Sequence, residues 1–366
     1  MISRGPVAAL WLFAASLALA GAELRAQSAA FRQLAETDTF LALTDLEFPL
    51  WAYGYREPPA NAEDWSDRCE GTRPRDCDRP GGMPRDTTGE LLSVPGSDRQ
   101  FPVEIITHPY TPADWFPNDH PPMPQIVAHG KEDSGFRACA ICHYPNGHGL
   151  MQNGPLAGLS VDYFLQQLDD FANDRRLTAD LNKANGFEMA AMARNMTDEE
   201  QRQAAEYYAS IPFQKWVRVI ESDTVPVFTA TRNGLFLESE DGETEPLGMR
   251  VVEMPEDTYQ SNMLRNPRSG MKAYVPIGSI ARGEQIVRTG GERSTECLTC
   301  HGQDLLGTPI APPIAGRQPS YVARQLYDMK VGTRAGAMAA TMQLAVQHLT
   351  EEDIINIVAF VASRDP

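Results

Sequence analysis

The hydrophobic pattern at the start of the chain predicts an export signal. Residues 7–20 form an apolar run close behind Arg4, and small residues stand at Ala20 and Ala22. This layout is typical of a secretory signal peptide and predicts cleavage after Ala22, so residues 1–22 are removed. An uncleaved membrane anchor is the alternative, because the run approaches the roughly 18–20 residues that span a bilayer. We expect an exported protein in the periplasm.

Two later segments share an amphipathic helical pattern. "MTDEEQRQAAEYYAS" begins at Met196 and "LTEEDIINIVAFVAS" begins at Leu349, and in each a threonine precedes three acidic residues and a periodic apolar run. A threonine N-cap followed by acids in the first turn marks a helix start. The sequence therefore predicts a capped helix at Thr197 and another at Thr350.

The segment between these helices has a different pattern. "KWVRVIESDTVPVF", "GLFLES", "GMRVVEMP" and "MKAYVPIGS" are short β-branched or alternating runs separated by Pro, Gly, Asn and Asp. Such runs predict a small β insert over residues 213–278. Its acidic turn "ESEDGETE" is interpreted as a solvated loop, with metal binding as an alternative that has no EF-hand spacing behind it.

Four of the six cysteines lie in two copies of the motif CxxCH, 158 residues apart. The two thiols can reach one porphyrin edge while the histidine reaches the iron, so each motif predicts a covalently bound haem c. A thioredoxin-like pair would need an α/β pattern, a zinc knuckle would need four ligands together, and structural thiols would not explain the histidines. The predicted residues are Cys139, Cys142 and His143 in the first copy and Cys297, Cys300 and His301 in the second.

Cys69 and Cys77 remain outside the two motifs. An even remainder in an exported protein favours a disulfide, here one that closes a short polar loop. Cysteine ligation of a haem is the alternative, and no nearby motif supports it. We predict a Cys69–Cys77 disulfide.

The similarity between the two copies extends beyond the cysteines. At an offset of 158, "PLAGLSVDYFLQQLDDFANDRR" from Pro155 matches "PIAGRQPSYVARQLYDMKVGTR" from Pro313 without a gap. The chain therefore contains a duplicated unit. Identical pairs include Tyr163/Tyr321, Gln167/Gln325, Asp170/Asp328 and Arg176/Arg334.

Haem iron that only shuttles electrons needs a second strong ligand, and a methionine thioether raises its potential. When the two capped helices are superposed, the offset becomes 153, and Met189 and Met342 are the methionines that coincide. We predict these two as distal ligands, with Met192 and Met338 as runners-up. Any of the 14 methionines can instead fill a gap in a core. Histidines outside the motifs that offer a further alternative are His108, His120, His129, His148 and His348.

Together these features resemble the tandem di-haem class I cytochromes c, particularly the cytochrome c4 type. The resemblance covers residues 124–212 and 277–362 and implies two small helical domains, each around one haem with His and Met ligands. It also implies that a backbone carbonyl accepts the proximal imidazole proton. Pro312 holds that position in the second copy and Gly154 in the first, where the rigidity of proline is lost. The expected haem-pocket residues are Gly154, Pro155, Pro312, Pro313, Tyr163, Tyr321, Arg176 and Arg334.

We therefore predict a mainly α protein with two class I cytochrome c domains in tandem. The irregular, proline-rich N-terminal extension carries Trp51, Tyr53, Tyr55, Trp115 and Phe116. It is interpreted as a packing strap, with shielding of a haem edge or docking of a partner as the alternative. The predicted divisions are 1–22 signal peptide, 23–122 extension, 123–212 first cytochrome domain, 213–278 β-rich linker and 279–366 second cytochrome domain.

The charge balance of the chain limits the classes of partner it is expected to bind. The 366 residues carry a net charge of -17, and removal of residues 1–22 takes away Arg4 and no acid, which leaves 31 basic and 49 acidic residues and a charge of -18. This balance argues against nucleic acid as a partner. The acidic surface is read as a solvated one, with steering toward a basic redox partner as the alternative. Membrane contact is expected only through partners or an uncleaved signal.

These interpretations predict an electron-transfer protein and not an enzyme. The expected donor is a periplasmic dehydrogenase or quinol-oxidising complex, and the expected acceptor is an oxidase or another cytochrome. One alternative is a permanent cytochrome subunit of a dehydrogenase complex, such as one that oxidises alcohols. Another is a di-haem peroxidase or thiosulfate dehydrogenase with one open iron position, against which the two matching methionines argue.

Overall fold

The structure, a computed structural model, describes residues 48–56, 89–150, 153–180, 183–231 and 234–366, which belong to one unit. The predicted signal peptide and the predicted Cys69–Cys77 disulfide lie outside the described residues. In the part of the chain that is described, no helix combines the length and the apolar character needed to cross a bilayer.

The first CxxCH unit consists of short helices, two of which begin with a side-chain cap. Ser160 accepts a hydrogen bond from the Tyr163 amide at the start of one, and Thr197 and Glu200 form a reciprocal capping box at another. These bonds satisfy amides that the helix itself leaves unpaired. The elements are α6 (Gln125–Ala128), the 3-10 turn η1 (Glu132–Ser134), α7 (Ala140–His143), α8 (Val161–Ala172), α9 (Ala184–Arg194) and α10 (Asp198–Ala209). Its core includes Phe164, Leu168, Ala205 and Tyr208.

The second unit repeats this plan with a longer first helix. Thr350 and Asp353 form the matching capping box of its last helix. The elements are α11 (Ser279–Thr289), α12 (Leu298–His301), α13 (Pro319–Lys330), α14 (Ala339–Val346) and α15 (Glu351–Ser363). The mainly α class predicted from the sequence is confirmed by these helices.

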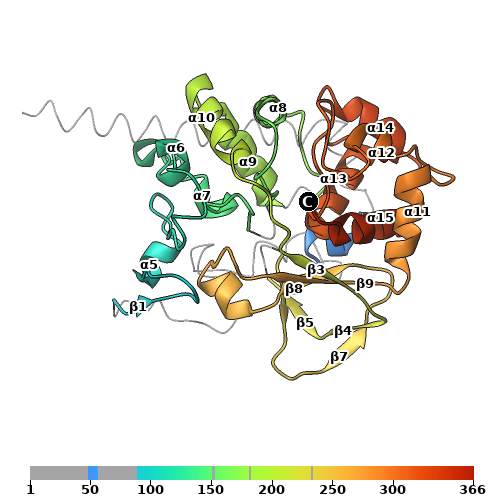
Figure 1. Cartoon of the computed structure of the whole chain (residues 1–366), viewed down its shortest axis with the longest axis horizontal. Coiled ribbons are helices and arrows are strands. Elements are labelled where there is room, and N and C mark those ends of the chain that lie inside the picture. Colours follow the sequence, from blue (N-terminus) through green and yellow to red (C-terminus); the bar gives the residue numbers. More distant parts are fainter. Residues whose placement is uncertain (1–47, 57–88, 151–152, 181–182, 232–233) are drawn as a thin grey trace, which may run out of the picture. The chain divides into compact units, whose positions relative to one another are not determined.

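Helix α11 packs across α15 at a distance that only glycine permits (Figure 1). A Cβ at Gly283 would overlap the backbone carbonyl oxygen of Asn356 and would lie 2.8 Å from Cβ of Phe360. The first unit has only the single turn α6 against α10 at the corresponding place. The second unit is therefore the more completely packed copy.

Short strands lie between α10 and α11 (Figure 1). A three-stranded sheet has the order β3-β9-β8, with β3 parallel and β8 antiparallel to β9. Along β9 the buried residues alternate at Met271, Ala273 and Val275, which is the period-two pattern of a half-buried strand. The bounds are β3 (Val217–Glu221), β4 (Thr224–Pro226), β5 (Phe228–Ala230), β6 (Phe236–Glu238), β7 (Thr244–Pro246), β8 (Val252–Pro255), the π-helical turn η2 (Tyr259–Met263) and β9 (Met271–Val275). Two further pairs, β4 with β7 and β5 with β6, are antiparallel.

The described part of the N-terminal region is irregular and anchored by aromatic side chains. Trp51 and Tyr53 are buried in the core of the second unit, and Trp51 Nε1 donates to Glu351 Oε1 at 2.8 Å. Trp115 Nε1 donates to the carbonyl of Leu264 at 2.7 Å. The elements are α3 (Leu50–Tyr53), β1 (Leu91–Leu92), β2 (Phe101–Pro102) and α5 (Val103–Ile106).

Candidate functional site

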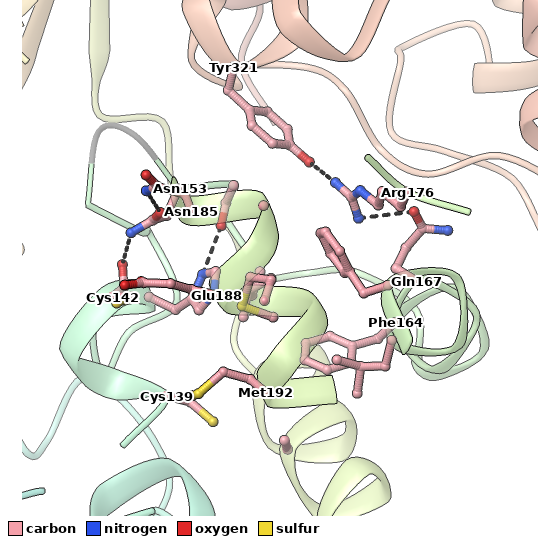
Figure 2. Close-up of a pocket in the computed structure, with 18 of the residues that line it drawn as sticks. Cys139, Cys142, Asn153, Phe164, Gln167, Arg176, Asn185, Glu188, Met192 and Tyr321 are labelled. Carbon is pink, nitrogen blue, oxygen red and sulfur yellow. Dashed lines mark hydrogen bonds between the residues drawn. The ribbon is translucent and has the colours of Figure 1, made fainter. Parts of the chain in front are cut away.

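The first CxxCH motif opens into a pocket. Cys142 and His143 lie on α7 and Cys139 is the N-cap of that helix, so one helical turn presents all three side chains. Figure 2 shows Cys139 and Cys142 on one side of this pocket and Phe164 and Gln167 of α8 on the other. Both cysteines are free thiols. Burial raises the pKa of Cys139 to about 12, so the thiol stays protonated.

His143 is held in one tautomer. Its Nδ1 lies 3.1 Å from the carbonyl oxygen of Gly154, and because a carbonyl only accepts, Nδ1 carries the hydrogen. Nε2 is then the unprotonated nitrogen that can bind a metal. Burial lowers the pKa of His143 to about 4, which keeps the ring neutral.

The second CxxCH motif has the same arrangement on α12. Cys300 and His301 line a second pocket together with Cys297, the N-cap of α12. His301 Nδ1 lies 2.9 Å from the carbonyl oxygen of Pro312, and burial lowers the pKa of the ring. Both carbonyls are those that the family resemblance implies, so glycine at 154 preserves the bond that proline makes at 312.

Methionines line each pocket together with the motif residues. Met189 and Met192 lie on α9 three residues apart, so both face the first pocket, which Met196 also lines. Met342 on α14 and Met338, its N-cap, line the second pocket. Met338 is 49% exposed, whereas Met342 packs against the core. The structure thus brings each predicted methionine and its runner-up to the pocket of its own motif.

The histidines considered as alternative ligands lie elsewhere. His148, for example, stacks on Trp216 with ring centroids 5.2 Å apart, and its Nδ1 lies 3.2 Å from the carbonyl oxygen of Pro267. Within the described residues, neither pocket is lined by His108, His120, His129, His148 or His348.

Several predicted pocket residues serve both pockets. Tyr163 of the first repeat and Tyr321 of the second each line both cavities. Arg176 lines the first pocket and Arg334 the second, and Arg176 donates to Gln167 Oε1 at 2.9 Å (Figure 2). Pro155, which precedes the repeated Ala-Gly of the first unit, lines the second pocket, as Pro312 and Pro313 do.

Sequence reasoning missed Arg317, which ties the units together. Its guanidinium is buried and donates to the carbonyls of Pro155 at 2.7 Å, Ala157 at 3.1 Å and Pro313 at 2.8 Å. It also lies over the Phe213 ring at 4.5 Å. The available signal was a mismatch, because at the repeat offset of 158 Arg317 replaces Leu159.

It also missed a buried polar wall of the first pocket. Lys183, Arg324 and Asp328 line this pocket and are all buried. At its rim, Arg137 pairs with Glu188 at 2.6 Å. Of these residues only Asp328 belongs to a feature predicted from the sequence, the repeat pair Asp170/Asp328, and only the folded chain brings them together.

The residues present fit a haem in each pocket. Each site combines two thiols three residues apart, a neutral histidine with a fixed tautomer, and methionine thioethers in the pocket lining. The free space is about 1450 Å³ in the first pocket and about 1590 Å³ in the second, open mouths included. In the described part of the chain, no group of three or more His, Cys, Asp or Glu forms a bare metal site.

Comparisons with known proteins agree with this chemistry. The family model described as Cytochrome c matches residues 280–365. Cytochrome c-554(548) of Halomonas halodenitrificans is 34% identical over 89 residues, which is 24% of this chain and 99% of that protein. Cytochrome c4 of Pseudomonas aeruginosa is 24% identical over 229 residues, which is 61% of this chain and 82% of that protein.

A third relative has a name that refers to a redox reaction. The thiosulfate dehydrogenase electron acceptor of Stutzerimonas stutzeri is 21% identical over 242 residues. The match covers 65% of this chain and 84% of that protein.

Proposed function

Because this chain belongs to the cytochrome c family, as a cytochrome c4-like tandem cytochrome with two covalently bound haem c groups, we propose that it relays single electrons between redox partners in the periplasm. Electron transfer by a c-type cytochrome is the activity that its relatives support. The donor and the acceptor are proposed by class: a periplasmic dehydrogenase or quinol-oxidising complex, and an oxidase or another cytochrome.

We assign the roles of the site residues in each pocket as follows. Bound haem iron supplies a one-electron Fe(III)/Fe(II) couple. In a haem-loaded pocket the cysteines would hold the group by thioether bonds, Nε2 of His143 and of His301 would bind the iron, and Met189 and Met342 would supply the second ligand. The Gly154 and Pro312 carbonyls hold the imidazoles through their Nδ1 hydrogens. With both ligands in place, the iron would have no free position for a small molecule.

The observation that carries the proposal is the shared wall of the two pockets. Tyr163, Gln167, Tyr321 and Gln325 line both cavities. An electron that enters at one site is therefore separated from the other by packed side chains of the same chain, which supports a relay through two centres. A single isolated redox centre would need no such sharing.

The proposal includes the organisation of the chain. Residues 123–212 and 279–366 are the two cytochrome domains, 213–278 the β-rich linker, and 23–122 the extension. The signal peptide, residues 1–22, directs export to the periplasm and is cleaved after Ala22, and Cys69 and Cys77 form a disulfide in that compartment. We expect oxidising conditions in that compartment to favour this bond.

A second candidate is a cytochrome subunit that stays bound to its dehydrogenase. The relative named as a thiosulfate dehydrogenase electron acceptor favours this possibility. In that case the chain would co-purify with the dehydrogenase at stoichiometric ratio, whereas a mobile carrier would purify alone.

The test is a haem count followed by a redox titration. We expect two haems per chain by pyridine haemochrome and two reversible one-electron components. A count other than two, or rapid turnover of peroxide by the purified protein, would contradict the proposal.

A further inference from the structure

One carboxylate on the wall of the first pocket is held only by neutral donors. Asp328 lies on α13 of the second repeat, is 4% exposed and lines the pocket of the first CxxCH motif. Its Oδ1 accepts from Tyr53 Oη at 2.7 Å, from the amide of Ala179 at 2.8 Å and from Thr333 Oγ1 at 3.4 Å. No ion pair among the described residues includes Asp328.

The repeat supplies a natural comparison in Asp170. It holds the same position on α8 and lines the second pocket. There Arg175 Nε pairs with Asp170 Oδ1 at 3.0 Å, and Gln167 donates to Oδ2 at 3.3 Å. In the first repeat the duplicated aspartate, Asp170, forms an ion pair with a guanidinium, whereas in the second repeat Asp328 accepts hydrogen bonds from neutral groups.

The groups around Asp328 come from several elements. Arg324 lies one turn earlier on α13 and donates to the Ala52 carbonyl at 2.6 Å, and Lys183 Nζ lies 3.4 Å from the Tyr53 carbonyl. The titratable and charged groups that face this site are Tyr53, Lys183, Arg324, Tyr327 and Arg334, with Asp180 and Glu253 beside them.

Burial raises the pKa of Asp328 to about 6, although Tyr53, the Ala179 amide, Arg324 and Arg334 act to lower it. A buried carboxyl with such surroundings can change its protonation near neutral pH. The haem-pocket wall therefore contains a group that can respond to a change of charge inside the pocket.

We infer, on the basis of the proposed function, that Asp328 is a protonation site coupled to the redox state of the first haem. When a one-electron donor protein reduces the ferric iron of that site to ferrous, the pKa of Asp328 rises, and at pH values near that pKa the carboxylate takes up a fraction of a proton from solvent. The carboxylate becomes a carboxylic acid, so the added negative charge in the buried pocket is neutralised. On oxidation by the acceptor, the proton returns to solvent.

Tyr53 is a positioning residue for the protonation site at Asp328. Its hydroxyl donates to the ionised carboxylate, and the N-terminal segment that carries it packs in the core of the second unit. Because this bond favours the charged form, Tyr53→Phe should raise the pKa of Asp328. The pH range over which the potential of the first haem depends on pH should then move to higher values.

The test is a redox titration of the haem-loaded protein between pH 5 and 8. At a fixed ambient potential, we expect the reduced-to-oxidised ratio of one component to fall about three- to tenfold over this range, which corresponds to a redox-linked change of about half to one in pKa. The other component should stay flat. Asp328→Asn should abolish the pH dependence and Asp170→Asn should retain it.

Infrared difference spectroscopy gives a second readout. The reduced-minus-oxidised spectrum of the unmodified protein at pH 6–7 should contain a carboxylic acid C=O band that Asp328→Asn removes and Tyr53→Phe shifts. A titration flat with pH, or one equally pH-dependent in Asp328→Asn, overturns the inference. If Asp328→Asn does not fold, the Tyr53→Phe titration decides, and an unmoved pH range overturns it. Loss of two reversible components in the unmodified protein would instead contradict the proposed function.

Discussion

Arg176 and Arg334, which occupy the same position in the two repeats, pair with each other through their backbones as an antiparallel bridge. Their guanidinium groups then cross between the units. Arg176 donates to the Tyr321 hydroxyl at 3.1 Å, and Arg334 donates to the Tyr163 hydroxyl at 2.8 Å. Each arginine also donates to the duplicated glutamines of both repeats. One pseudo-symmetric network therefore forms the wall common to the two pockets.

Removal of one arginine should destabilise this wall strongly. Arg334→Met removes one of the two arginine donors to each of the Gln167 and Gln325 oxygens and the donor to the Tyr163 hydroxyl. We expect the free energy of unfolding to fall by about 2–4 kcal/mol, because three hydrogen bonds from a buried charged donor are lost. Urea unfolding of the haem-loaded protein measures it.

The matched control for Arg334→Met is Arg288→Met on α11. The Arg288 side chain is 50% exposed and, among the described residues, bonds only Glu284 one turn away. Its loss should cost less than about 1 kcal/mol. Equal midpoint shifts in the two variants would show that the network adds no stability.

The distal ligand assignment predicts a spectral difference between neighbouring methionines. Met342→Ala should remove the weak red thioether-to-iron band of one haem and lower its potential by part of the roughly 0.8 V over which axial ligands act. Met338→Ala should leave both unchanged, because Met338 is half exposed at the pocket edge. Loss of the band in Met338→Ala, with the band retained in Met342→Ala, would identify Met338 as the distal ligand. Met189→Ala and Met192→Ala form the same pair in the first site.

Local patterns in the sequence predicted the local structure well. The threonine N-caps of α10 and α15 form capping boxes, and the β-branched runs coincide with β3, β8 and β9. Each motif places its thiols and histidine on one helical turn, which covalent spacing alone dictates. Such features depend on residues within a few positions of one another.

The way in which side chains of each repeat reach the pocket of the other repeat could not be predicted from local patterns. Alignment of the repeats equates Tyr163 with Tyr321, but it does not say that each side chain also lines the pocket of the other copy. That depends on tertiary packing between residues about 160 positions apart. The one local sign of this packing was at position 317, where an arginine departs from the repeat.

The close crossing of α11 and α15 predicts a severe effect of one methyl group. Gly283→Ala places a Cβ against the Asn356 carbonyl, and neither helix can yield without losing buried contacts. We expect a loss of about 3 kcal/mol or more in the free energy of unfolding. Gln285→Ala, on an exposed position of the same helix, should change it by less than about 0.5 kcal/mol. Thermal unfolding of the two variants side by side checks this, and equal Tm values would contradict the packing argument.

The capping box of α15 should make stability depend on acid pH. Burial acts to raise the pKa of Asp353, but bonds from Arg293 and from Thr350 outweigh it and hold that pKa below the ordinary value. A carboxyl with a depressed folded-state pKa contributes its stabilisation fully above the unfolded value of about 3.9 and loses it as pH falls through the folded value. Asp353→Asn should therefore be about 1 kcal/mol less stable than the unmodified protein at pH 6, and the gap should close below about pH 3.

Urea unfolding of haem-loaded protein at pH 6, 4.5 and 3 measures the gap for Asp353→Asn. Glu352→Gln is the control, because Glu352 lies in the same first helical turn but forms no part of the capping box. It should lose only the helix-dipole contribution of about 0.3 kcal/mol. A gap for Asp353→Asn that stays constant from pH 6 to pH 3 would mean that the carboxyl acts through packing alone. A gap that widens as the pH falls would reverse the sign expected from a depressed pKa.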